Sequence, residues 1–437
     1  LPYFNHLADK NMTILWDNGH FWILSIGFTL FTALIAGSYP ALYLSSFRPV
    51  KVLKGVFKAG KLAAVPRKAL VVLQFTVSVV LIVGTIIVFN QIRFAKNRPV
   101  GYNRNGLIYI GMQTDDLHNH FDAISTDLKN SGAVTYLAQS SSPPTGVENN
   151  RSGLVWEGKD PNMTDDFANI RVTTDYGKTV GWQFVDGRDF SNQYLTDSLA
   201  LIINEAAVKY MNLKNPVGET IRVGMKKEYH VIGVVKDMVM SSPYEPAKQT
   251  IYYITHEDFS YVLIRLNPNI SAHESLQKIE SVCKTYSPSV PFSFQFTDEA
   301  YATKFSNEER IGNLAGRFAI LAIFISCLGL FGMATFTAEQ RIKEIGVRKV
   351  LGASVFNLWG LLSKDFVVLV VISLFIAVPL SYYFFNNWLQ HYEYRATIPW
   401  WAFAVTGVGA ILITLLTVSF QSISAALVNP VKSLRSE

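Results

Sequence analysis

Long uncharged runs alternate with basic segments along this chain. Phe318–Ala338 contains no charged residue and matches the roughly 20 residues that an α-helix needs to cross about 30 Å of hydrocarbon. Phe366–Gln390 is at least as long, and further uncharged apolar runs occupy Phe21–Phe47, Ala69–Ile92 and Thr397–Val428. The pattern therefore predicts five transmembrane helices.

Basic residues orient these helices. The segment between the first two predicted spans, residues 47–68, carries lysines and arginines but no acid, so the positive-inside rule places it in the cytoplasm. Alternation then places residues 93–317 outside and residues 339–365 inside. The content of 49% hydrophobic and 16% charged residues agrees with an integral membrane protein. Because the net charge of +6 is concentrated in short loops beside the spans, we do not expect nucleic acid as a partner.

Residues 93–317 have the composition of a soluble domain, and their pattern predicts an α+β fold. Strand-like runs lie at Leu107–Met112, Val134–Gln139, Leu199–Ile203, Tyr229–Val235, Thr250–Ile254, Tyr261–Leu266 and Phe292–Phe296. Helix-like stretches lie at Leu117–Lys129, Glu205–Met211 and Ala272–Thr285. The strand–helix–strand order from Leu107 resembles the order from Tyr261. We therefore expect two split βαβ units to form one subdomain, with residues of about 145–228 inserted as a second.

The expected fold class is a membrane protein with an α-helical transmembrane bundle and a large outer α+β domain. The predicted division of the chain is residues 1–60 as the last span and basic tail of a preceding repeat, 61–92 as a span, 93–317 as the periplasmic domain with helical stalks, 318–338 as a span, 339–365 as a cytoplasmic coupling segment, 366–428 as two spans, and 429–437 as a cytoplasmic tail.

The start of the chain resembles its end. Pro49–Lys54 reads PVKVLK and Pro430–Arg435 reads PVKSLR, and in both places an apolar run precedes the motif. Duplicated membrane units are common in transporters. We therefore expect the chain to be the C-terminal part of a longer, duplicated membrane protein with eight spans, whose other half would contain a matching outer domain and three more spans.

The segment Glu339–Ser354, EQRIKEIGVRKVLGAS, is the strongest candidate for a functional site. It combines both signs of charge with apolar residues and two glycines, as a docking element for a protein partner would. Taken alone, such a segment is equally typical of an amphipathic loop on anionic lipid. The candidate coupling residues are Glu339, Arg341, Lys343, Glu344, Gly346, Arg348, Lys349 and Gly352.

With this segment the chain resembles the FtsX-like, MacB-type permease family of ABC transporters, whose R-x-K-E-I-G-[VI]-R-x-x-x-G-A pattern it matches from Arg341 to Ala353. Weaker supporting matches lie in the same order as in the family. They are Gln74-Phe75, Gly187-Arg188-Asp189-Phe190, Asn204-Glu205-Ala206-Ala207, Asn215-Pro216-Val217-Gly218 and Val231–Asp237. Together they extend over nearly the whole chain.

The resemblance implies a permease of the bacterial inner membrane whose outer domain is a large α+β periplasmic domain, made of a porter-like subdomain and an inserted subdomain. It converts closure of separate cytoplasmic ATPases into movement of this periplasmic domain, which is called mechanotransmission. The implied partners are an ATP-binding ABC subunit, membrane lipid, and a periplasmic adaptor or outer-membrane channel. The family leaves the substrate open: a drug or peptide for efflux, a lipoprotein to be extracted from the membrane, or a wall hydrolase to be switched on. Because the sequence contains no G-x-x-x-x-G-K-[ST] motif, ATP hydrolysis is expected in a separate subunit.

Other functions find little support in the sequence. We expect no catalytic residues, no metal and no cofactor; His118 and His120 with Asp115 and Asp116 are interpreted as a solvated loop. Ion-coupled transport is disfavoured because all five predicted spans lack Asp, Glu, Lys and Arg. The alternative that stays open is a membrane-anchored periplasmic sensor or wall-hydrolase regulator without export.

Overall fold

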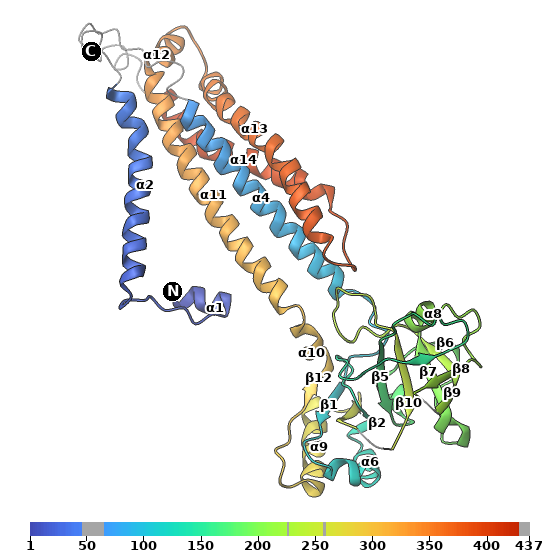
Figure 1. The fold of residues 1–437 in the computed structure, drawn as a ribbon. Helices are drawn as coiled ribbons and strands as arrows, with labels where there is room; N and C mark the ends of the chain where they lie inside the picture. Colours follow the sequence, from blue (N-terminus) through green and yellow to red (C-terminus); the bar gives the residue numbers. More distant parts are fainter. Residues whose placement is uncertain (46–64, 225–226, 257–258, 428–437) are drawn as a thin grey trace. The chain divides into compact units, whose positions relative to one another are not determined.

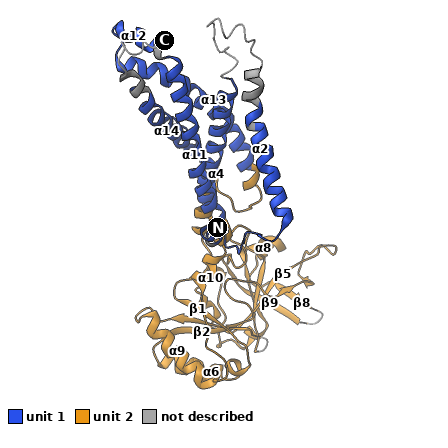
Figure 2. Cartoon of the chain, turned by 90° about the vertical axis from the view of Figure 1, so that its left-hand side faces the viewer, with its two compact units in different colours: residues 1–89, 310–386, 398–437 blue, residues 90–309, 387–397 orange. Residues whose placement is uncertain are grey.

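The computed structural model describes residues 1–45, 65–224, 227–256 and 259–427. The chain forms two compact units, shown in different colours in Figure 2. The first comprises Leu1–Phe89, Arg310–Asn386 and Ile398–Glu437, and the second comprises Asn90–Glu309 and Asn387–Thr397. The repeated motifs at 49–54 and 430–435 lie outside the described residues.

The first unit is helical (Figure 1). Its elements are α1 (Pro2–Ala8), α2 (Gly19–Ser45), α4 (Val65–Lys96), α11 (Ser306–Gln340), α12 (Ile342–Val350), α13 (Val355–Leu389) and α14 (Trp400–Leu427). Within the described residues four helices, α4, α11, α13 and α14, are long and apolar enough to cross a membrane. They coincide with four of the five predicted spans. In α2 the apolar part that is described covers only Gly19–Ile35, so the first span stays a prediction.

Small residues allow the long helices to approach closely. The Ser78 and Ser326 hydroxyls, on α4 and α11, form a hydrogen bond of 3.1 Å. A Cβ atom at Gly84 of α4 would overlap the ring of Phe385 on α13. Because lipid gives no hydrophobic driving force between helices, such tight contacts and interhelical hydrogen bonds are what hold a bundle together.

The second unit contains the outer ends of α4, α11 and α13 and an α+β domain. One mixed sheet runs in the order β12-β1-β11-β2-β5-β10-β7-β9-β8-β4, with β3 paired to β5 and β6 to β9. The strands are β1 (Leu107–Gly111), β2 (Val134–Ser140), β3 (Asn150–Arg151), β4 (Leu154–Val155), β5 (Phe167–Val172), β6 (Phe184–Gly187), β7 (Ala200–Asn204), β8 (Thr220–Val223), β9 (Lys227–Val235), β10 (Thr250–Ile254), β11 (Tyr261–Leu266) and β12 (Gln295–Phe296). The helices are α5 (Asp116–Asn119), α6 (Phe121–Asn130), α7 (Tyr176–Val180), the 3₁₀ helix η2 (Leu195–Leu199), α8 (Glu205–Met211), α9 (Ala272–Tyr286) and α10 (Thr297–Thr303).

The porter-like half is the split βαβ arrangement that the sequence predicts. β1 lies between β12 and β11, and β11 pairs antiparallel with both β1 and β2. Helices α6 and α9 contribute Leu128 and Ile279 to a core that also contains Ile108, Leu137 and Ile264. The predicted helix Leu117–Lys129 is divided at His120 into α5 and α6.

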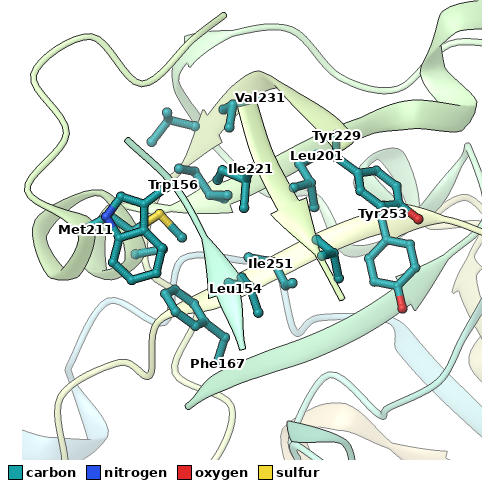
Figure 3. Packing of buried hydrophobic residues seen from close by; sticks show 14 residues of the cluster. Leu154, Trp156, Phe167, Leu201, Met211, Ile221, Tyr229, Val231, Ile251 and Tyr253 are labelled. Atoms are coloured by element: carbon teal, nitrogen blue, oxygen red, sulfur yellow. The ribbon is translucent and has the colours of Figure 1, made fainter. Parts of the chain in front are cut away.

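The second half has its own core, shown in Figure 3. Trp156 and Phe167 meet edge to face with ring centroids 6.0 Å apart, and the core also includes Tyr229 and Tyr253. The predicted end of the insertion at about residue 228 is therefore too early, because β9 and β10 both belong to this core. β2 of the porter-like half pairs with β5 of the second half where Ser140 lies opposite Val172.

Candidate functional site

The predicted coupling segment forms the short helix α12, which is separated from α11 by one residue. Arg341 occupies the junction, where its backbone N–H is shared between the carbonyls of Thr337 and Ala338 at 3.2 Å each. All eight candidate residues lie between the last turn of α11, which holds Glu339, and the turn after α12, which holds Gly352. The segment is thus helical from its start to the turn that leads into α13.

Two kinds of contact hold α12 against α13. The Arg341 guanidinium forms an ion pair with the Asp365 carboxylate at 2.8 Å. Ile345 is 4% exposed and packs against Leu358 and Leu362. Ile345, one of the apolar residues of the predicted docking element, is therefore used inside the protein and is not available to a partner. Asp365 was not predicted; its only signal is that it is an acid directly before a long apolar run.

Gly352 makes the turn between α12 and α13. Its φ is +91°, in the left-handed region that favours glycine. The Ala353 N–H donates to the Arg348 carbonyl at 3.0 Å and the Gly352 N–H donates to the Lys349 carbonyl at 3.1 Å, which is the hydrogen-bond pattern of a Schellman cap. The glycine in the family pattern is therefore explained by backbone conformation.

Glu344 and Arg348 pair with each other on the surface of α12. Their side chains are 2.7 Å apart at spacing i, i+4, and each is slightly less than half exposed. Pairs of this kind contribute only about 0.3–0.5 kcal/mol. The pair thus presents both signs of charge to solvent. Because it contributes so little to the stability of α12, a partner that rearranges it loses little free energy.

Apolar side chains are exposed beside these charges. Val347, Val350 and Leu351 are 48%, 66% and 80% exposed, and Phe356 at the start of α13 is 73% exposed. Large exposed apolar groups that adjoin charged residues are typical of surfaces that bind another protein. Together with Glu344 and Arg348 they define what we call the docking face of α12.

The short motifs of the outer domain have a different role. Asn204 is 1% exposed and makes four hydrogen bonds. Its Oδ1 accepts from the N–H groups of Ala207 and Thr250 at 3.0 and 2.8 Å, and its Nδ2 donates to Asp237 Oδ1 and the Lys248 carbonyl at 2.8 and 2.9 Å. The Asn-Glu-Ala-Ala motif and the strand motif ending at Asp237 therefore hold each other in place.

A second pair of motifs meets backbone to backbone. A Cβ at Gly233 would lie 2.5 Å from the Arg188 carbonyl oxygen, so only glycine fits without a shift. Arg188 itself forms a two-pronged ion pair with Asp197, at 2.6 and 2.8 Å. Burial raises the pKa of the neighbouring Asp189 to about 6. The hydrogen bonds that its carboxylate accepts from the Trp182 indole and the Phe190 N–H act in the opposite direction and lower the pKa.

The predicted loop with His118 and His120 contains the short helix α5 and shows ordinary local contacts. The His120 ring nitrogen lies 2.9 Å from the Asp116 carbonyl oxygen, within one helical turn. Among the described residues, no group of three or more His, Cys, Asp or Glu side chains is arranged to hold a metal ion.

Two family models match the chain. Residues 69–282 match the MacB-like periplasmic core domain, and residues 317–430 match the FtsX-like permease C-terminal region. The chain therefore belongs to the MacB-type ABC permease family, as an FtsX-like permease with a MacB-like periplasmic core domain. It is a multi-pass membrane protein whose α+β domain lies outside the cytoplasm.

Curated relatives and solved structures are distant. The chain is 24% identical to a macrolide export ATP-binding/permease protein MacB of Campylobacter fetus over 49% of its own length and 35% of the relative's. It is 22% identical to the MacB of Chromobacterium violaceum over 61% and 43%, respectively. The chain thus spans less than half the length of these relatives. The periplasmic region of MacB from Actinobacillus actinomycetemcomitans aligns with 46% of the chain and 94% of that structure, at 14% identity and a TM-score of 0.34.

Proposed function

We propose that this chain is the permease of an ABC transporter and that it transmits the motion of a separate cytoplasmic ATPase to its outer domain. In this proposal α12 is the element that binds the ATPase. The outer domain then moves a periplasmic or membrane substrate, for export or for extraction from the bilayer. The membrane is the bacterial inner membrane, and the complete permease is the duplicated, eight-span form.

One observation carries the proposal: α12 is fixed on one side and available on the other. Arg341 and Ile345 attach it to α13, whereas Val347, Val350 and Leu351 are exposed beside the Glu344–Arg348 pair. A docking element needs both properties. Without attachment to α13, the helix would move with its partner but would not transmit the motion to the spans. Without an exposed face, it would have no surface to which a partner can bind.

The ATPase is proposed as a separate subunit because the chain lacks a phosphate-binding motif of the G-x-x-x-x-G-K-[ST] type. The named relatives are ATP-binding/permease proteins, and the chain matches only part of their length. We therefore expect the ATP-binding part of the system to join the permease from the cytoplasm, where the docking face of α12 would meet it.

The test is a charge reversal that leaves the helix intact. In the double variant Glu344→Arg with Arg348→Glu, opposite charges still face each other at i, i+4, so α12 should stay folded. The pattern that a partner meets is inverted, and we expect the ATPase recovered with the tagged, full-length permease in mild detergent to fall about tenfold, which corresponds to about 1.4 kcal/mol.

The chain provides a matched control. Glu280 and Lys284 form the same i, i+4 pair on α9 of the outer domain, at 2.6 Å. Reversing both of these charges should leave ATPase recovery unchanged. Equal recovery from the two double variants would remove α12 from the interface, and the reproducible absence of any ATPase with the unaltered protein would favour a sensor.

A further inference from the structure

The connection between α13 and α14 belongs to the second unit, together with the α+β domain (Figure 2). We call residues 390–397 the outer loop. It meets two other parts of this unit, the end of α4 and the segment Ser241–Glu245 between β9 and β10. The residues just before α11 contact that segment in turn. The contacts among these four parts are polar and aromatic, and they are described in turn.

Gln91 on α4 holds the outer loop by its backbone. The side chain is 1% exposed. Its Nε2 donates to the Tyr394 carbonyl at 2.9 Å, and its Oε1 accepts from the Ala396 N–H at 2.7 Å. Both functional groups of this buried amide are thus satisfied by the loop, so displacing the loop would leave buried polar groups unpaired on both sides.

The backbone of Tyr394 continues the contact to the domain, because its N–H donates to the Tyr244 carbonyl at 3.0 Å. The Tyr394 ring stacks on Phe94 with centroids 4.7 Å apart and receives the Arg98 guanidinium at 4.4 Å. Arg98 also donates to the carbonyls of Pro243 and Glu245, at 3.1 and 2.5 Å. One arginine therefore joins the α4 end, the outer loop and the segment Ser241–Glu245.

Tyr244 forms the aromatic side of the same junction. Its ring centroid lies 4.9 Å from that of Tyr392 in the outer loop and 5.7 Å from that of Phe305, just before α11. Lys304 donates to the Ser241 carbonyl at 2.6 Å. The segment Ser241–Glu245 is accordingly held from three directions.

Helix α13 connects this junction with α12. It is one helix from Val355 to Leu389. Between Leu358 and Asp365 it carries the contacts to the Ile345 cluster and the ion pair with Arg341. The outer loop follows directly after its last residue. A displacement of α12 along the axis of α13 therefore reaches Ser241–Glu245 without passing through α4 or α11.

We infer that the outer loop is a further mechanical attachment of the spans to the outer domain, that α13 drives it, and that Gln91 is the positioning residue that keeps it engaged. The segment Ser241–Glu245 receives the motion and leads into β10, whose Ile251 and Tyr253 lie in the core of the inserted half. The inference rests on the proposed function, since it names the path by which ATPase motion reaches that half.

The test uses the full-length permease with its co-purified ATPase, and compares hydrogen exchange with and without a non-hydrolysable ATP analogue. In the unaltered protein, peptides covering 339–352 and peptides covering 236–249 should both change their exchange on nucleotide addition. Gln91→Met has a similar volume but makes neither hydrogen bond to the loop. We expect it to abolish the nucleotide response at 236–249 and to leave the response at 339–352 intact.

A control and a second variant separate coupling from general damage. Gln390→Leu alters an exposed glutamine at the start of the same loop and should preserve both responses. Tyr244→Leu removes the aromatic contact from the domain side and should also silence 236–249. Both variants break the same attachment. The double variant Gln91→Met with Tyr244→Leu should therefore lose no more of the nucleotide response at 236–249 than either single variant.

Each outcome has one meaning. A full response at 236–249 in both Gln91→Met and Tyr244→Leu overturns the inference and leaves the proposed function standing. No response at 339–352 in the unaltered complex overturns the proposed function, and the inference with it. Loss of the response at 236–249 alone, in both variants, supports the attachment.

Discussion

Family motifs occur in two regions of this molecule and are used in opposite ways. In the outer domain, Asn204 and Gly233 are buried. Asn204 holds backbone segments together by hydrogen bonds, and Gly233 allows two of them to approach closely. In α12, Arg341 fixes the helix to α13, while Glu344 and Arg348 remain on the surface. A match to a family motif thus marks fold maintenance in one region and an available surface in the other.

The difference shows which family motifs indicate contact with a partner and which only maintain the fold. A buried polar residue with all its hydrogen bonds made is expensive to change, whatever the function of the protein. A surface pair with a small energetic contribution has no such structural reason to match a family. The exposed motif of α12 is therefore the better candidate for contact with a partner, and substitutions in the two regions should separate stability from coupling.

Asn204→Ala should have the largest effect. It removes four hydrogen bonds and leaves several buried groups unpaired, so we expect the free energy of unfolding of the outer domain to fall by about 3 kcal/mol or more. Denaturant unfolding of the full-length chain in detergent, followed by tryptophan fluorescence, measures this. Asn162→Ala, at an exposed position, should stay within about 0.5 kcal/mol of the unaltered protein.

Gly233→Ala should follow, with a loss of about 2 kcal/mol, because the added methyl group would force the Arg188 backbone away. Gly111→Ala is the control, since a Cβ there lies 3.9 Å from its nearest neighbour, Tyr261. The same unfolding measurement applies. An equal effect of the two alanines would show that backbone contact is not the reason for the glycine at 233.

Arg341→Gln should show the opposite balance of effects from the outer-domain variants: it should change coupling to the ATPase more than the stability of the fold. The Arg341–Asp365 pair is partly exposed, so its loss should lower stability by at most about 1 kcal/mol. With α12 loosened, we expect ATPase recovery to fall several-fold. The exchanged pair Arg341→Asp with Asp365→Arg should restore recovery in part, and Arg222→Gln, which breaks an exposed pair with Glu228, should have no effect on it.

The smallest effect concerns pH. Asp189 has a folded-state pKa of about 6, raised from 3.8 by burial. Between these two pH values the folded state therefore binds more protons than the unfolded state, so this group's contribution to stability declines as pH rises from about 4 to about 6 and is constant above. Because Asp189 accepts a hydrogen bond of 3.2 Å from the Trp182 indole, the fluorescence difference between the unaltered protein and Trp182→Phe should titrate with a midpoint near pH 6. A midpoint near 4 would contradict the burial argument.

Much of the fold could be predicted from the pattern of residues. Strands such as β10 and β11 and helix α8 appear where the sequence places them, because each has a clear local signal of period or capping. Strand β5, Phe167–Val172, was not predicted. It contains the polar residues Asn169 and Arg171 in a largely buried strand. The Asn169 Nδ2 donates to the Tyr253 hydroxyl of β10, a strand that is distant in the sequence. Local hydropathy cannot reveal such a partner.

The sequence by itself determined the four long membrane helices of the described chain, the α+β class of the outer domain and the position of the α12 segment. Hydrocarbon length, side-chain period and turn residues act on neighbouring residues, so these features can be read locally. Only the tertiary structure decided that Ile345 faces inward, that Arg341 meets Asp365 and that Gln91 holds the loop some three hundred residues later. These contacts depend on which distant groups the fold brings within hydrogen-bond reach, and nothing in a segment's own sequence specifies them.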